Sequence, residues 1–185
     1  MEHETIQRQS FAKTCLKSEV FSHVLFESCD FTQSVLTGAR FLECRFVSCN
    51  WSLTKIDGTR LQDVSFEKGK CVGVDFSKCD PLFLSLAFTN CLIDTCNFSH
   101  LNLKNTPFRA CTIKETHFTE CNLMNAQFGE SNLIGSIFHK SDLTKANFIA
   151  AINYSINPLT NKLTKAQFSN PEVLNLLKYL EITIE

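Results

Sequence analysis

All seventeen phenylalanines of this chain fall on a spacing of five residues. One register runs from Phe11 to Phe76 and a second from Phe83 to Phe148, with Phe168 returning to the second after a break. Grid positions without phenylalanine hold Leu, Ile, Trp or Cys. An α-helix repeats its apolar face every 3.6 residues and a strand every 2, so neither element alone produces this pattern. The chain must therefore turn a corner at every repeat.

A second position repeats with the first. The residue two places before each large apolar residue is usually small, and the residue between the two is often Asn, Asp, Lys or Arg. We interpret each unit as small, polar, large, followed by two mostly polar residues. The small and the large side chain are then predicted to face inward, and the residue between them is predicted to face solvent.

Several of these units resemble a known family. Residues 39–43 (ARFLE), 126–130 (AQFGE) and 146–150 (ANFIA) look like the A(D/N)LXX units of pentapeptide-repeat proteins. The resemblance covers about residues 11–168. It implies an all-β solenoid, a right-handed quadrilateral β-helix with four pentapeptides per coil, and the two registers then give about seven coils.

The repeat divides the chain into three parts. Residues 1–10 are polar and are expected to form an N-terminal cap or tail. Residues 11–168 are expected to form one solenoid, with a register shift at 77–82 and an excursion at 150–162. Residues 169–185 are expected to form a C-terminal helix and strand that serve capping and dimerisation, because the ends of a β-helix leave unpaired edges.

The C-terminal part begins with Ser169, Asn170, Pro171 and Glu172, which together are typical of a helix start. An apolar stripe at α-helical spacing follows, and it has two candidate partners, the open end of the same rod or a second copy. More apolar residues are present than one cap needs, so a homodimer is predicted as well. The residues predicted for the cap or dimer interface are Val173, Leu174, Leu176, Leu177, Tyr179, Leu180, Ile182 and Ile184.

Ten cysteines would suggest disulfides in a small secreted protein or a metal site in a cytosolic one. Position argues for a third interpretation, in which cysteine is a small hydrophobe of the lumen. Cys71 occupies a large inward position, and stacking one coil apart leaves Cys29 and Cys49 within the reach of a disulfide. Without a CxxC pair, no metal or cofactor is predicted. The cysteines predicted at small inward positions are Cys29, Cys44, Cys49, Cys91, Cys96, Cys111 and Cys121.

Abundant reduced thiols and the lack of a secretory signal favour a cytoplasmic protein, and no apolar run is long enough for a membrane span. Enzyme motifs such as GxSxG, HExxH and a phosphate loop are missing from the sequence. His100, Glu120 and Lys140 are predicted to stack in one surface column, which we interpret as a solvated charge ladder. The protein is therefore predicted not to be an enzyme.

The C-terminal run 155–163 and the helix after it are similar to the ends of two subfamilies, the microcin B immunity protein and the quinolone-resistance proteins. That resemblance implies a homodimer that engages DNA gyrase or topoisomerase IV, in some members as a mimic of duplex DNA. The quinolone-resistance members also carry long projecting loops, whereas the only interruption here is two residues near 77–82.

Charge argues against broad mimicry of DNA. Duplex DNA carries about one negative charge per 1.7 Å, so a rod on the order of 34 Å would need about twenty. This chain has 19 acidic and 18 basic residues, a net charge of −1. No basic stripe with interleaved aromatics predicts direct nucleic-acid binding either. The leading hypothesis is a non-enzymatic interaction scaffold with an unknown partner. The alternative is a topoisomerase-binding protein that gives quinolone-resistance- or microcin-immunity-type protection, with partial DNA mimicry.

Overall fold

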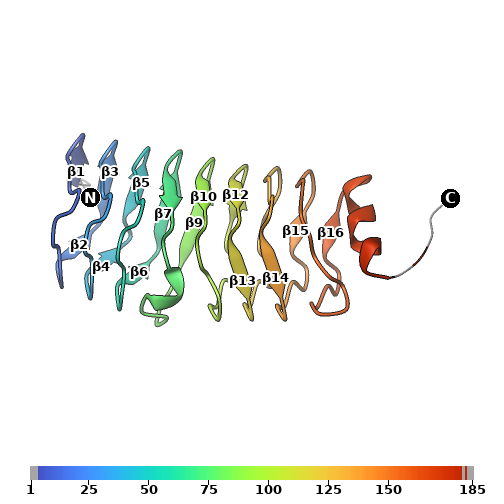
Figure 1. Ribbon diagram of the computed structural model, residues 1–185. Coiled ribbons are helices and arrows are strands. Elements are labelled where there is room, and N and C mark those ends of the chain that lie inside the picture. The colour runs from blue at the N-terminus through green and yellow to red at the C-terminus, as the bar shows by residue number, and fades with distance from the viewer. Residues whose placement is uncertain (1–3, 181, 183–185) are drawn as a thin grey trace.

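The computed structural model describes residues 4–180 and residue 182. The chain winds into a rod of stacked coils, with the N-terminal coils at one end and a short helix at the other (Figure 1). Each coil pairs in parallel with the next at a spacing of 20 residues, as Phe26 does with Phe46 and Phe118 with Phe138. The predicted β-solenoid is confirmed, and it has about eight coils.

Parallel pairing between coils generates several narrow sheets rather than one broad sheet. The six-stranded sheet contains β1 (Glu4–Gln7), β3 (Val24–Glu27), β5 (Arg45–Val47), β7 (Val64–Glu67), β9 (Leu86–Thr89) and β11 (Phe108–Arg109). The three-stranded sheets contain β2 (Val20–Ser22), β4 (Arg40–Leu42) and β6 (Arg60–Gln62), and β8 (Lys70–Val72), β10 (Leu92–Asp94) and β12 (Thr112–Lys114). The remaining pairs are β13 (His117–Thr119) with β14 (Ile137–His139), and β15 (Asn147–Phe148) with β16 (Gln167–Phe168). Two 3₁₀ helices are η1 (Phe76–Lys78) and η2 (Glu172–Tyr179).

The solenoid starts earlier than the phenylalanine grid indicates. Residues 1–10 are expected to be a cap or tail, but Glu4–Gln7 form β1 and pair with β3. Ile6 of β1 lies opposite Phe26 and packs against the core, so an aliphatic residue holds the grid position there. Residues 1–3 lie outside the described part of the chain.

The corners of the coils are made by single left-handed residues, most of which are not glycine. Ser28 and Ser48 have φ angles of 55° and 54°. Such a conformation costs a residue with a Cβ roughly 1–2 kcal/mol. The corner N–H groups are nevertheless used in the ladder, because Ser28 donates to the Val47 carbonyl and Ser48 to the Glu67 carbonyl, each at 2.8 Å. The stacked coils thus supply the bond that stabilises each corner.

The lumen is filled by stacked aromatic rings. Phe108 lies between Phe88 and Phe128, with centroid distances of 5.2 and 5.0 Å and nearly parallel planes. It also meets Phe98 and Phe118 of the opposite wall edge to face, at 5.7 and 5.6 Å. Both geometries are favourable for aromatic pairs, and the stacking distance is close to the spacing of adjacent strands. In this half of the rod leucine and isoleucine fill the other two walls, as the alternation in the sequence predicts.

The cysteines lie where the grid predicts them. The eight cysteines assigned to the lumen are buried, Cys79 is buried too, and Cys15 is exposed. All ten are free thiols. The buried thiols bond to backbone carbonyls of the preceding coil, as Cys49 Sγ does to Phe26 O at 3.4 Å and Cys121 Sγ to Phe98 O at 3.1 Å. Burial raises the pKa of Cys49 to about 12 and that of Cys121 to about 11.

These environments predict a selective pattern of alkylation. The thiolate is the nucleophile, and burial both shields it and disfavours it. At neutral pH we expect a maleimide to modify Cys15 alone in the native protein and all ten cysteines in denaturant, read by mass spectrometry of the intact chain. A Cys15→Ser variant should take up no label under native conditions. Rapid native labelling of a second cysteine would show that the lumen opens more readily than this packing allows.

The segment 150–162 breaks the five-residue spacing but stays within the coil. Ile152 bridges to Asn132, and Ile156 bridges to Phe138, which is 18 residues before it rather than 20. Tyr154 is buried against Phe148, with ring centroids 5.8 Å apart. The expected excursion is therefore a local change of spacing in which a tyrosine takes a place in the lumen.

The C-terminal helix is present, but its geometry differs from the predicted α-helix. η2 is a 3₁₀ helix, and its last bond runs from Leu180 N to Leu177 O at 2.9 Å, a separation of three residues. Among the described residues, neither helix is long and apolar enough to cross a membrane.

Candidate functional site

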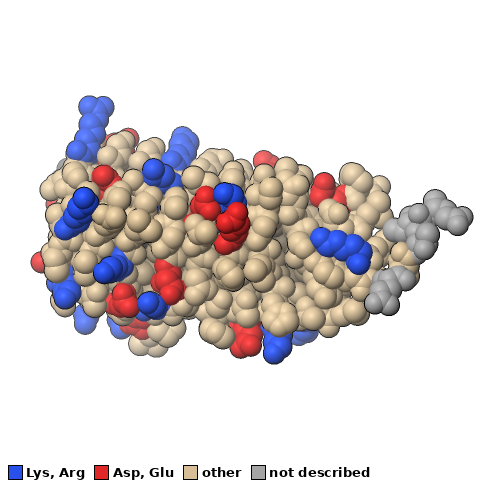
Figure 2. All heavy atoms as spheres, in the orientation of Figure 1, with Lys and Arg blue, Asp and Glu red and all other residues tan. Residues whose placement is uncertain are grey.

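Charged side chains are scattered over the rod rather than gathered by sign. On the face in Figure 2, acidic and basic residues alternate and no continuous stripe of one sign forms. His100 Nδ1 lies 3.3 Å from Glu120 Oε2, and both side chains are exposed, as expected of a solvated ladder. Many acidic groups lie within 4.0 Å of a basic or histidine nitrogen, and these are Glu43, Asp57, Glu67, Asp75, Asp80, Asp94, Glu115, Glu120 and Asp142.

The 3₁₀ geometry sorts the apolar residues of η2 into two rows. With three residues per turn, positions i and i+3 eclipse each other. Val173, Leu176 and Tyr179 then form an inner row, whose members are all partly buried, and Leu176 packs against the core. An outer row consists of Leu174, Leu177 and Leu180. Leu174 is 50% exposed and Leu180 is 39% exposed.

The predicted single stripe is therefore wrong in its membership. It assumed 3.6 residues per turn and placed Leu180 with the buried residues and Tyr179 outside them. The structure reverses these two assignments because η2 has a shorter period. Ile182, also predicted for the interface, is 55% exposed, and Ile184 lies outside the described residues.

More exposed apolar side chains lie on the last two coils, and the sequence analysis did not assign them to a site. We call them the apolar belt, and they are Ile134, Ile137, Ile149, Ile152 and Leu159. Most of the large apolar side chains that the described residues expose thus belong to the belt or to the C-terminal tail. An available signal was isoleucine at outward positions of the repeat, where earlier coils mostly carry polar residues.

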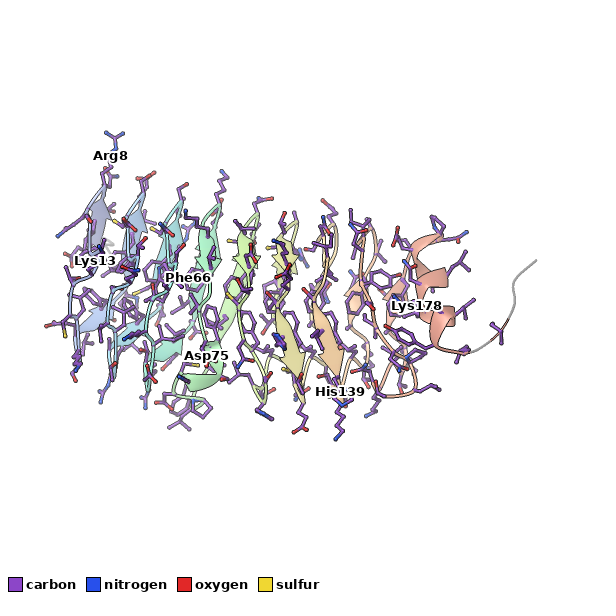
Figure 3. All side chains as sticks on the ribbon, in the orientation of Figure 1. Arg8, Lys13, Phe66, Asp75, His139 and Lys178 are labelled. Carbon is purple, nitrogen blue, oxygen red and sulfur yellow. The ribbon has the colours of Figure 1, made fainter. Side chains whose placement is uncertain are left out.

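The tail is held to the last coil by a polar cluster. The Ser155 and Tyr179 hydroxyl oxygens are 2.6 Å apart, and Lys178 Nζ donates to Ser155 Oγ at 3.0 Å. These bonds join η2 to the segment that follows Tyr154. Figure 3 shows Lys178 on η2 and His139 on the coil of β14. The helix is therefore docked by hydrogen bonds on one side while its outer row stays uncovered.

The register shift forms a small projecting loop, and here a prediction fails. Phe83 was assigned to the lumen with the other phenylalanines, yet its side chain is 63% exposed. The two extra residues follow Phe83 rather than precede it, since Phe66 pairs with Phe88. Phe83 consequently takes a left-handed corner, with a φ of 62°, and Leu84 packs against the core instead.

The exposed ring has polar neighbours. The Arg60 guanidinium carbon lies 5.7 Å from the centre of the Phe83 ring, within the range of a cation–π contact. Arg60 also donates from Nε and from an Nη nitrogen to Asp80 Oδ2, at 3.1 and 3.0 Å. Leu82 beside Phe83 is exposed as well. The loop thus presents two large apolar side chains on a base that is fixed by an ion pair, in the green part of the ribbon in Figure 1.

Comparisons with known proteins agree with this architecture. The family model described as the pentapeptide repeat region matches residues 19–81 and 82–151. Among solved structures, the chain is similar to HetL, a pentapeptide repeat protein involved in heterocyst differentiation regulation from the cyanobacterium Nostoc sp. strain PCC 7120. That match has a TM-score of 0.59 and 17% identity, over 89% of this chain and 85% of HetL.

A second similar structure is a trypsin-treated variant of QnrB1, a plasmid-mediated fluoroquinolone resistance protein. Its TM-score is 0.50 at 17% identity, over 99% of this chain and 98% of that chain. No curated protein matches the chain. At this identity the structural likeness shows the fold alone.

Proposed function

The chain belongs to the pentapeptide repeat family, and because its lumen is filled by buried side chains, we propose that it is a non-enzymatic interaction protein. Its binding partners then meet the outer surface and the C-terminal end. The observation that carries this proposal is the concentration of exposed apolar side chains at that end, in the outer row of η2 and in the apolar belt. Exposed apolar patches of this kind mark interaction sites.

The first partner in this proposal is a second copy of the chain. The outer row lies at the end of a solenoid whose last coils are otherwise complete, so a copy that docks there adds a helix face to a helix face. The apolar belt extends the same surface onto the sides of the last two coils. Both parts are uncharged, as the core of a protein interface usually is. The proposed assembly is a homodimer through the C-terminal ends.

A second candidate function is protection of a type II topoisomerase, DNA gyrase or topoisomerase IV. The feature that favours it is the projecting loop with Leu82 and Phe83, because aromatic side chains with an apolar neighbour are typical contact points between proteins. A fluoroquinolone resistance protein is also among the structures that share the fold. Paired acidic groups do not favour mimicry of DNA charge, so the contact in this candidate is apolar.

A supercoiling assay distinguishes the two candidates. If the second is right, the purified protein alters gyrase supercoiling or protects it from a fluoroquinolone. A variant with Leu82→Ser and Phe83→Ala then needs at least about tenfold more protein for the same effect, since each removes about 1–2 kcal/mol of apolar contact. Leu53→Ser, at another exposed leucine, is the matched control. No inhibition, no protection and no capture of gyrase would exclude the topoisomerase role and leave self-association with another partner.

A further inference from the structure

A cavity of about 460 Å³ lies between η2 and the last coils. One wall is the stretch from Gly135 to His139, and another is formed by Ser155, Asn157 and Thr160. Tyr179 of η2 closes a third side. The cavity has the volume of a small-ligand site, and it lies against the polar cluster that joins the helix to the solenoid.

The hydroxyl groups of this cluster have one hydrogen to spare. Lys178 Nζ donates to Ser155 Oγ at 3.0 Å, so that oxygen already accepts one bond. Ser155 and Tyr179 carry one hydroxyl hydrogen each, and the single contact between them at 2.6 Å uses only one. Within the described part of the chain, the structure gives the other hydrogen no protein acceptor. The cluster therefore offers a donor toward a group that accepts.

The charge around the cavity has one sign. None of the lining residues is acidic, and His139 is among them. Over residues 4–180 and 182, no carboxylate lies within ion-pair distance of Lys178, whose contacts are Ser155 and the face of the Tyr179 ring at 5.2 Å. Lys162 and Lys114, by contrast, each reach an aspartate. Lys178 is thus a cation without a counter-ion beside a donor-rich cavity.

We propose that this cavity binds an oxyanion, the carboxylate or phosphate group of a ligand. Lys178 supplies the charge, and the spare hydroxyl hydrogen of the Ser155 and Tyr179 pair supplies a directed bond. Bonds with an ionised partner are stronger than neutral ones, which favours an anion over a neutral acceptor. Because these residues come from both η2 and the coil, a bound anion ties the helix more firmly to the solenoid.

The test titrates sodium phosphate and, separately, sodium acetate into the full chain at constant ionic strength, adjusted with sodium chloride. Chemical shifts of backbone amides are followed by ¹H–¹⁵N NMR. We expect saturable shifts confined to residues 135–139, 155–160 and 178–179 with at least one of the two anions. The phosphate and acetate arms show which oxyanion the cavity prefers.

Two variants examine the roles of the named groups. Lys178→Gln is expected to weaken binding about tenfold or more, and Tyr179→Phe, which keeps the ring, several-fold. Lys165→Gln, at an exposed lysine of the last coil, is the matched control and should bind as the unmodified protein does. Linear shifts with neither anion saturating would overturn the proposal. Equal loss in the Lys178 and Lys165 variants would also overturn it, because that result describes general screening and an adventitious ion only.

Discussion

Replacement of Phe108 with alanine is expected to lower the free energy of unfolding by about 3–5 kcal/mol. The ring is fully buried and has aromatic neighbours in the coils on both sides and on the opposite wall. Its removal leaves a cavity in a lumen whose backbone is fixed by hydrogen bonds to adjacent coils, so the walls cannot collapse into the space. Urea unfolding followed by circular dichroism measures the change.

Phe83→Ala is the matched control, because the residue type and the position on the five-residue grid are the same. Its side chain is exposed and touches only the Arg60 guanidinium from above. We expect a change within about 0.5 kcal/mol. Equal losses in the two variants would mean that Phe83 is buried in solution. A loss below about 1 kcal/mol in Phe108→Ala would mean that the lumen is not packed as described.

The second large effect concerns self-association. Leu174→Glu combined with Leu180→Glu places two charges in the outer row of η2, and in the proposed dimer these charges face apolar side chains of the second copy. Burial of an unpaired carboxylate is costly, so the dissociation constant should rise at least about 100-fold. Sedimentation velocity over a range of concentrations should show dimer for the unmodified protein and monomer for the variant.

Two controls accompany this variant. Leu53→Glu changes a leucine of similar exposure far from η2 and should leave the dimer intact. The circular dichroism spectrum and thermal midpoint of the double variant should stay near those of the unmodified protein, since both leucines are largely outside the core. Unchanged association of the double variant would place the interface elsewhere.

The interior could be predicted from the sequence because it repeats. Phe108 and Cys49 are each one of many residues with the same spacing, so local exceptions do not alter the period that defines the coil. The same regularity explains the error at Phe83. An insertion of two residues has the same effect on spacing whether it precedes or follows the phenylalanine, and only the pairing of Phe66 with Phe88 decides between the two.

The ends and the outer surface could be predicted only in part. The sequence indicated a helix after Pro171, but the apolar residues of a short segment fit a period of 3.0 as well as one of 3.6. Contact between Tyr179 and Ser155 depends on how η2 docks, which no local pattern encodes. The apolar belt was visible as outward isoleucines, yet its position beside the outer row became clear only when the coils were stacked.

The proposal that this protein acts through its C-terminal end is tested most directly by sedimentation equilibrium of the unmodified chain. The account predicts a single species with twice the chain mass of 21.0 kDa. That species should persist at micromolar concentration, as expected for a specific interface of standard size. A mass of 21.0 kDa at every loading concentration up to about 100 μM would contradict it.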